Sequence, residues 1–94
     1  MRKLKRSPRF ERAFRKFVKR YSSEGDAVKR ALDQLSRDPF HPSLRTHKLK
    51  GKLSAALSCS CGYDCRIIFR LRKDSPNEDE YILLEDIGLR SEVY

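Results

Sequence analysis

The sequence predicts one α+β domain, spanning residues 1–94, in which a hairpin of two helices packs on a small, mostly antiparallel sheet. The expected element order is β-α-α-β-β-β, with or without one extra short strand. The chain has 94 residues, enough for one modest core and too few for two. Its first half holds two segments with apolar residues at helical spacing. Its second half holds short apolar segments separated by turn residues, which is typical of consecutive strands.

The first half supplies the predicted edge strand and both helices. Residues 2–6 are strongly basic and suit a short edge strand whose charges discourage unwanted pairing. Ser7 is followed by proline, a pattern typical of a helix start, and residues 10–21 carry one apolar stripe. The second helix is expected to begin at Ser23, as its cap, and to end before Pro39, because the residue preceding a proline is driven out of the helical region.

The second half contains the segment around which the other elements are expected to be arranged. Residues 46–51 and 55–61 are predicted strands, and a turn at residues 62–64 leads into a third strand over residues 65–71. Residues 81–87 form a further apolar strand, predicted to be central because it is apolar on both sides. Gly88 is expected to end it.

Positive charge dominates the chain and is concentrated at its start. The formal net charge is +9, and residues 1–20 alone carry +9, from ten lysines and arginines and one glutamate. Such a chain should attract a polyanion. Arg12, Lys16 and Lys19 share one helix face with almost no acidic partners at i+4, so this face is either an ordinary solvated surface or a nucleic-acid-binding surface.

Composition also bears on location and cofactors. No segment approaches the roughly twenty apolar residues that cross a bilayer, and the start lacks the apolar part of a secretion signal, so a soluble cytoplasmic protein without membrane contact is expected. Cys59, Cys61 and Cys65 are an odd set, unlike a disulfide framework, and their spacing fits structural zinc poorly. They are interpreted as small buried strand residues.

Three stretches in order carry a resemblance to a known family. They read PFHPSLRTHKLKG, GYDCRIIF, and a terminal IG followed by EVY. Together they resemble the RelE/ParE superfamily of bacterial type II toxins, most closely RelE/StbE and YafQ-type mRNA interferases, and the resemblance spans nearly the whole chain. It implies a RelE-like fold and a toxin held inactive by a cognate antitoxin. It also implies a ribosome-dependent endoribonuclease that cuts mRNA in the ribosomal A site.

The resemblance implies 2′-hydroxyl attack on the neighbouring phosphate with no metal and no small-molecule cofactor. Position by position, it assigns acid–base work to His47, whose ordinary pKa lies near neutrality, and to Asp64, which orients a histidine or accepts a proton. Arg66 would contact the scissile phosphate through its planar fork of donors. Tyr94 would stack on or contact the substrate, and Arg90 would stabilise phosphate charge.

Further basic residues would hold the RNA backbone without sequence preference. These are Lys48, Lys50 and Lys52 near the histidine, together with the helix face of Arg12, Lys16 and Lys19.

One departure from the family pattern bears on activity. Arg90 stands where relatives carry a histidine, and arginine does not release a proton at physiological pH. Activity is therefore lowered, or the chain is an attenuated member, or ribosomal groups supply the proton transfer. Two other functions stay open: a ParE-like inhibitor of DNA gyrase with the same fold, and a non-catalytic RNA-binding module with steeply salt-dependent affinity.

Overall fold

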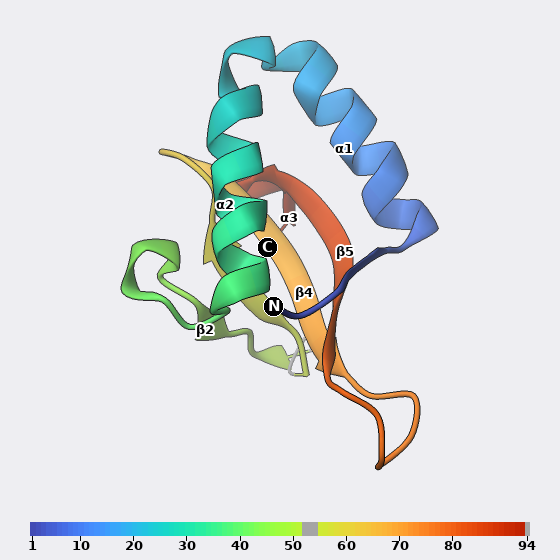
Figure 1. Ribbon diagram of the computed structural model, residues 1–94. Coiled ribbons are helices and arrows are strands. Elements are labelled where there is room, and N and C mark those ends of the chain that lie inside the picture. Colours follow the sequence, from blue (N-terminus) through green and yellow to red (C-terminus); the bar gives the residue numbers. More distant parts are fainter. Residues whose placement is uncertain (52–54, 94) are drawn as a thin grey trace.

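The computed structural model describes residues 1–51 and 55–93, and it confirms the predicted α+β fold (Figure 1). Helices α1 and α2 form a hairpin that lies over one face of a five-stranded sheet. In chain order the elements are β1 (Leu4–Arg6), α1 (Pro8–Arg20), the 3-10 turn η1 (Ser22–Glu24), α2 (Gly25–Arg37), the 3-10 turn η2 (Pro42–Leu44), β2 (His47–Lys48), β3 (Leu57–Ser60), β4 (Cys65–Arg72), β5 (Tyr81–Leu89) and α3 (Arg90–Val93).

The sheet has the strand order β1-β5-β4-β3-β2. Strand β1 pairs with β5 in parallel, and the other neighbours pair antiparallel. The basic N-terminal strand is therefore an edge strand and β5 an interior strand, as predicted. Gly88 does not end β5. It lies inside the strand, opposite Arg66 of β4.

A register shift occurs where β4 and β5 meet. Ile68 lies opposite Asp86 and Phe69 lies opposite Leu84, so Glu85 is an extra residue on β5. Such a bulge changes which later residues point to a given face. Here it allows Leu84, before the bulge, and Ile87, after it, to enter the same core.

The main core lies between the sheet and the helical hairpin. It joins side chains from α1, α2, β4 and β5, among them Phe10, Phe17, Val28, Leu35, Ile67 and Phe69. Because successive strand residues point to opposite faces, Ile68 leaves this core and packs with Ala56 and Val93 in a smaller cluster. Helix α3 therefore covers part of the sheet face that α1 and α2 leave open. Among the described residues no helix is long and apolar enough to span a membrane.

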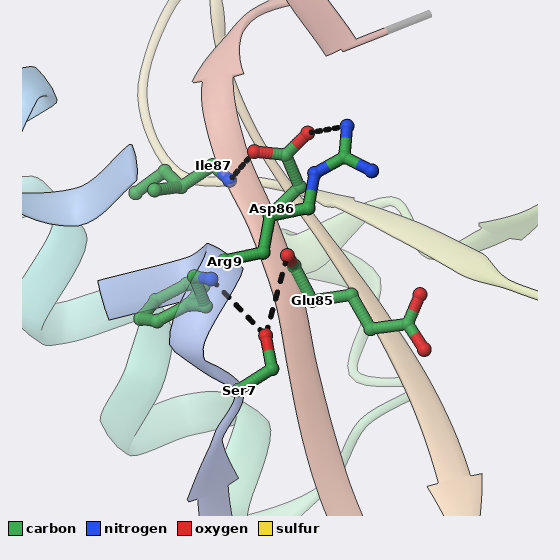
Figure 2. A network of polar contacts seen from close by, with 6 residues as sticks. Ser7, Arg9, Glu85, Asp86 and Ile87 are labelled. Atoms are coloured by element: carbon green, nitrogen blue, oxygen red, sulfur yellow. Dashed lines mark hydrogen bonds and ion pairs between the residues drawn. The ribbon is translucent and has the colours of Figure 1, made fainter. Parts of the chain in front are cut away.

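The start of α1 is fixed to β5 at the bulge (Figure 2). Ser7 Oγ accepts the backbone N–H of Phe10 at 3.0 Å, which confirms the predicted cap, and it also donates to the carbonyl of Glu85 at 3.5 Å. Arg9 pairs with Asp86 at 3.1 Å. These contacts set the position of the helical hairpin on the sheet.

The prediction that Ser23 caps the second helix is wrong. Ser23 lies within η1, and Glu24 is the N-cap residue of α2. A tight 3-10 turn takes up the serines because the chain must reverse direction between two helices that share one core. The end of α2 agrees with the prediction, since Arg37 is its last residue and Asp38 its C-cap, directly before the proline.

The three cysteines are buried, as predicted, but they are not equivalent. Cys61 and Cys65 form a disulfide between the end of β3 and the start of β4, with 5.0 Å between their Cα atoms, and the sequence analysis did not predict this bond. Cys59 is a free thiol, fully buried in the main core.

Candidate active site

A hollow of about 220 Å³ opens where β2, β3, β4 and the start of α3 come together. Three of its lining residues, His47, Arg66 and Arg90, are predicted catalytic residues that lie far apart in the sequence. The other two are Arg45 and Ser60. From the described residues the lining therefore receives three guanidinium groups, one imidazole and one hydroxyl.

Arg66 is held at the centre of the sheet. In register it lies between Ser60 of β3 and Gly88 of β5. Its Nη1 donates to the carbonyl of Cys65 at 2.8 Å, which fixes the direction of the side chain. Among residues 1–51 and 55–93 its guanidinium has no carboxylate partner. Its positive charge is therefore available to an external anion.

Arg90 reaches the hollow because α3 is fixed at both its start and its interior. The Arg90 N–H donates to the carbonyl of Asp64 at 2.9 Å, and Glu92 Oε1 accepts the N–H of Leu89 at 2.8 Å. A Cβ on Gly88 would lie 3.1 Å from Val93 Cγ1, so the absence of a side chain there lets α3 dock closely. The exposed Arg90 side chain then lines the hollow beside Arg66.

His47 has a defined ring orientation. Its Nδ1 lies 3.1 Å from the carbonyl oxygen of Arg45. A carbonyl oxygen only accepts, so Nδ1 carries the proton in this hydrogen bond. In the neutral imidazole Nε2 is then the basic nitrogen, which is the state a general base requires.

The site brings permanently charged side chains close to a buried, uncharged thiol. The three guanidinium groups stay protonated at any physiological pH. On the opposite side of β3, burial raises the pKa of the Cys59 thiol to about 12, although the positive charge of Arg66 acts against this rise. Cys59 is therefore a neutral core residue. No group of three or more possible metal ligands occurs within the described part of the chain.

Asp64 and two of the predicted lysines lie beside the hollow and do not line it. The backbone carbonyl of Asp64 accepts the backbone N–H of Arg90. The acid–base role of the Asp64 carboxylate stays a prediction. Lys48 on β2 and Lys50 after it are exposed. Lys52 and Tyr94 lie outside the described residues.

The basic face of α1 borders a second, larger hollow, referred to below as the α1 groove, with a volume of about 510 Å³. Lys16 and Lys19 line it, whereas Arg12 is exposed further along the helix. Apolar side chains from α1, β5 and α3 form much of the remaining lining: Ala13, Phe17, Tyr21, Ile87 and Val93. The α1 groove thus combines apolar contact area with lysine charge.

The sequence analysis missed Arg45 and Ser60. Arg45 immediately precedes Thr46 and His47 in the stretch PFHPSLRTHKLKG. Its position beside the predicted catalytic histidine could have identified it. Ser60 lies opposite Arg66 across the turn of residues 62–64, and it could have been found by pairing the two strands in register.

Comparison with known proteins shows the class of fold. No family model matches this chain, and no curated protein matches it by sequence. Solved structures do match over nearly the full length. YafQ from E. coli strain BL21(DE3) has a TM-score of 0.76 at 14% identity, covering 100% of this chain and 99% of that chain. In the E. coli DinJ–YafQ toxin–antitoxin complex the TM-score is 0.73 at 14% identity, with 99% and 97% covered.

Two further toxins agree with this match. The YoeB/ParE toxin from Agrobacterium tumefaciens has a TM-score of 0.73 at 13% identity, covering 93% of this chain and 97% of that chain. A copper-bound mutant toxin from Helicobacter pylori has a TM-score of 0.70 at 24% identity, with 100% of both chains covered. The chain therefore shares its fold with YafQ and with these other bacterial toxins.

Proposed function

We propose that this chain is the toxin of a type II toxin–antitoxin system and that it cuts mRNA as an endoribonuclease. The observation that carries the proposal is the hollow of about 220 Å³, in which His47 lies with guanidinium groups from β4 and α3. Attack of a ribose 2′-hydroxyl on the adjacent phosphate builds up negative charge on a phosphorane. Fixed cations stabilise such charge most where little water competes with them.

The proposed chemistry uses the groups of the hollow as they are oriented. His47 Nε2 removes the proton from the 2′-hydroxyl, because Nδ1 is already bonded to the Arg45 carbonyl. Arg66 and Arg90 hold the non-bridging phosphate oxygens. The 2′-oxygen bonds to phosphorus, the bond to the 5′-oxygen breaks, and a 2′,3′-cyclic phosphate remains. Arginine does not donate a proton at neutral pH, so in this proposal Asp64, in its acid form, or a group of the ribosome protonates the 5′-oxygen.

Substrate presentation is proposed to occur on the ribosome, with mRNA in the A site. The exposed lysines near the histidine, Lys48 and Lys50, and the sequence-predicted Lys52 would contact phosphates of the transcript. Lys16, Lys19 and Arg12 of α1 would add sequence-independent attraction to the RNA backbone. On this proposal the toxin acts in the cytoplasm.

The proposed partner is a cognate antitoxin. YafQ, which shares this fold, is solved in complex with DinJ as a toxin–antitoxin pair. The α1 groove offers apolar side chains bordered by Lys16 and Lys19, which suits an acidic amphipathic segment of such a partner.

The test is cleavage of a translated mRNA by purified protein, read as new 5′ ends. Arg66→Ala and His47→Ala should each lower the cleavage rate by about 100-fold or more, since single charge-stabilising or proton-transfer groups contribute this much. Arg72→Ala is the matched control, because Arg72 is an exposed arginine on the same strand as Arg66 and outside the hollow. It should cut at the rate of the parent.

Unchanged cutting in both active-site variants would remove these residues from the mechanism. Supercoiling by DNA gyrase, measured with the same preparations, tests the ParE-like alternative. Inhibition of gyrase together with intact mRNA would replace the nuclease proposal.

A further inference from the structure

Arg45 has an unusual backbone conformation for its residue type. Among the described residues it is the one non-glycine residue with a positive φ, at 51°, and it lies at the end of η2. Side chains other than that of glycine disfavour this left-handed region because the Cβ crowds the backbone. Residues held in such a conformation occur where the surrounding structure fixes them, and they gather at functional sites.

The residues on either side of Arg45 supply that constraint. The Arg45 N–H donates to the carbonyl of Pro42 at 3.2 Å, and Leu44, just before it, is 2% exposed in the main core. Thr46, just after it, donates its hydroxyl proton to the carbonyl of Pro39. The backbone is therefore fixed on both sides of Arg45.

The left-handed turn has two consequences at the hollow. It directs the carbonyl of Arg45 to Nδ1 of His47 at 3.1 Å. It also leaves the exposed Arg45 side chain lining the same hollow as Arg66 and Arg90. Within residues 1–51 and 55–93 no hydrogen bond or ion pair joins the Arg45 side chain to the protein.

Three like charges around one small opening repel one another, and only an anion relieves this repulsion. A phosphodiester suits the opening, because guanidinium groups bind phosphate oxygens in pairs through parallel N–H donors. A carboxylate of the protein does not fill this role among the described residues.

We propose that Arg45 is a third phosphate-binding residue of this site and that its carbonyl also positions His47. One residue then links anion binding to the orientation of the base. That the bound phosphate belongs to RNA rests on the proposed function. Phosphate binding by Arg45 itself does not require that the chain cuts RNA.

The substitution Arg45→Gly separates the side chain from the backbone. Glycine adopts the left-handed conformation without steric cost, so the carbonyl stays directed at His47 while the guanidinium is removed. Arg45→Val removes the same group, and its β-branched side chain disfavours the left-handed conformation more strongly than the unbranched arginine does, so it should also disturb the carbonyl. Arg72→Ala removes one exposed arginine charge elsewhere and serves as the control.

The probe is a short RNA with 2′-O-methyl groups, which cannot be cut by 2′-hydroxyl attack, and binding is measured by fluorescence anisotropy over a series of salt concentrations. Arg45→Gly should bind at least tenfold more weakly, and the slope of log affinity against log salt should fall by about one, as expected for one lost phosphate contact. Arg72→Ala should stay within about twofold of the parent. The Tm of Arg45→Gly should equal or exceed that of the parent.

The positioning role has its own readout. Ring ¹⁵N shifts of His47 report which nitrogen carries the proton. They should show the Nδ1–H form in the parent and in Arg45→Gly, and a shift toward a mixture of both forms in Arg45→Val. A purely structural residue would not produce this difference between the two variants.

The outcomes distinguish this inference from the proposed function. Parent-like binding by Arg45→Gly would overturn the phosphate-binding role even if the parent cuts mRNA. Weakened binding by Arg45→Gly, in a parent that never cuts RNA, would support the phosphate site and refute the nuclease. Identical His47 spectra in Arg45→Val and Arg45→Gly would overturn the positioning role.

Discussion

The disulfide between Cys61 and Cys65 closes the short turn that fixes two of the arginines lining the hollow. The two cysteines are four positions apart, and the segment that they close contains both anchoring carbonyls. The carbonyl of Cys65 accepts from the side chain of Arg66, and that of Asp64 accepts from the backbone of Arg90. Breaking the disulfide should therefore lower the stability of the fold and loosen the hollow.

The expected loss of stability follows from chain entropy. A cross-link that closes a loop of about five residues removes enough freedom from the unfolded chain to stabilise the fold by about 2 kcal/mol. For a domain of this size 1 kcal/mol corresponds to a Tm change of about 4–8 °C. Opening the disulfide should then lower the Tm by about 8–16 °C.

Thermal unfolding by circular dichroism measures this loss. The parent is compared with and without a dithiol reductant, and with the double variant Cys61→Ala/Cys65→Ala. The Tm of the variant should lie somewhat below that of the reduced parent, because the variant also loses the packing of the two buried sulfurs. Reductant should not change the Tm of the variant. Affinity for the 2′-O-methyl RNA should fall in the reduced parent. Equal Tm values for the oxidised and reduced parent would refute the reasoning.

Three further experiments test the fold. The pKa of Cys59 in the folded state, about 12, lies above that of the thiol in the unfolded chain. Between about pH 9 and 12 only the unfolded state loses this proton, so the free energy of unfolding falls as pH rises. In urea unfolding at a series of pH values, Cys59→Ala should flatten this fall, and an unchanged slope would contradict the prediction. Ser7→Ala removes the cap on the Phe10 N–H and should cost about 1 kcal/mol in urea unfolding, whereas a loss below about 0.3 kcal/mol would argue against the cap. The half-buried pair of Arg70 and Glu85, 2.6 Å apart, should show a coupling of about 1 kcal/mol in a double-mutant cycle, and additive effects would argue against it.

Sequence patterns predicted the elements of the fold better than their ends. Apolar spacing located both long helices and the strands, because each must bury one face in a shared core. Gly88 was misread as a strand end, since glycine usually weakens strands, whereas here its missing side chain leaves room for Val93. The extra residue at Glu85 and the 3-10 turn that takes up Ser23 depend on how distant segments pack, which local patterns do not record.

The candidate site was predicted in part. His47, Arg66 and Arg90 come from different segments, and the structure brings them to one hollow. Arg45 was missed because its role depends on a left-handed backbone that arginine rarely adopts, so nothing in its residue type signals it. Ser60 was missed because only the register of β3 against β4 places it beside Arg66.

In the proposed function this hollow drives a ribose 2′-hydroxyl onto the neighbouring phosphate. The most direct test first maps the cleavage sites of the parent on an all-ribose mRNA during translation, and then repeats the reaction with 2′-deoxyribose placed immediately 5′ of one mapped site. The account predicts 2′,3′-cyclic phosphate ends on the all-ribose transcript and no cut at the deoxy position, with neighbouring sites still cut. Cleavage at the deoxy position at an undiminished rate would contradict it.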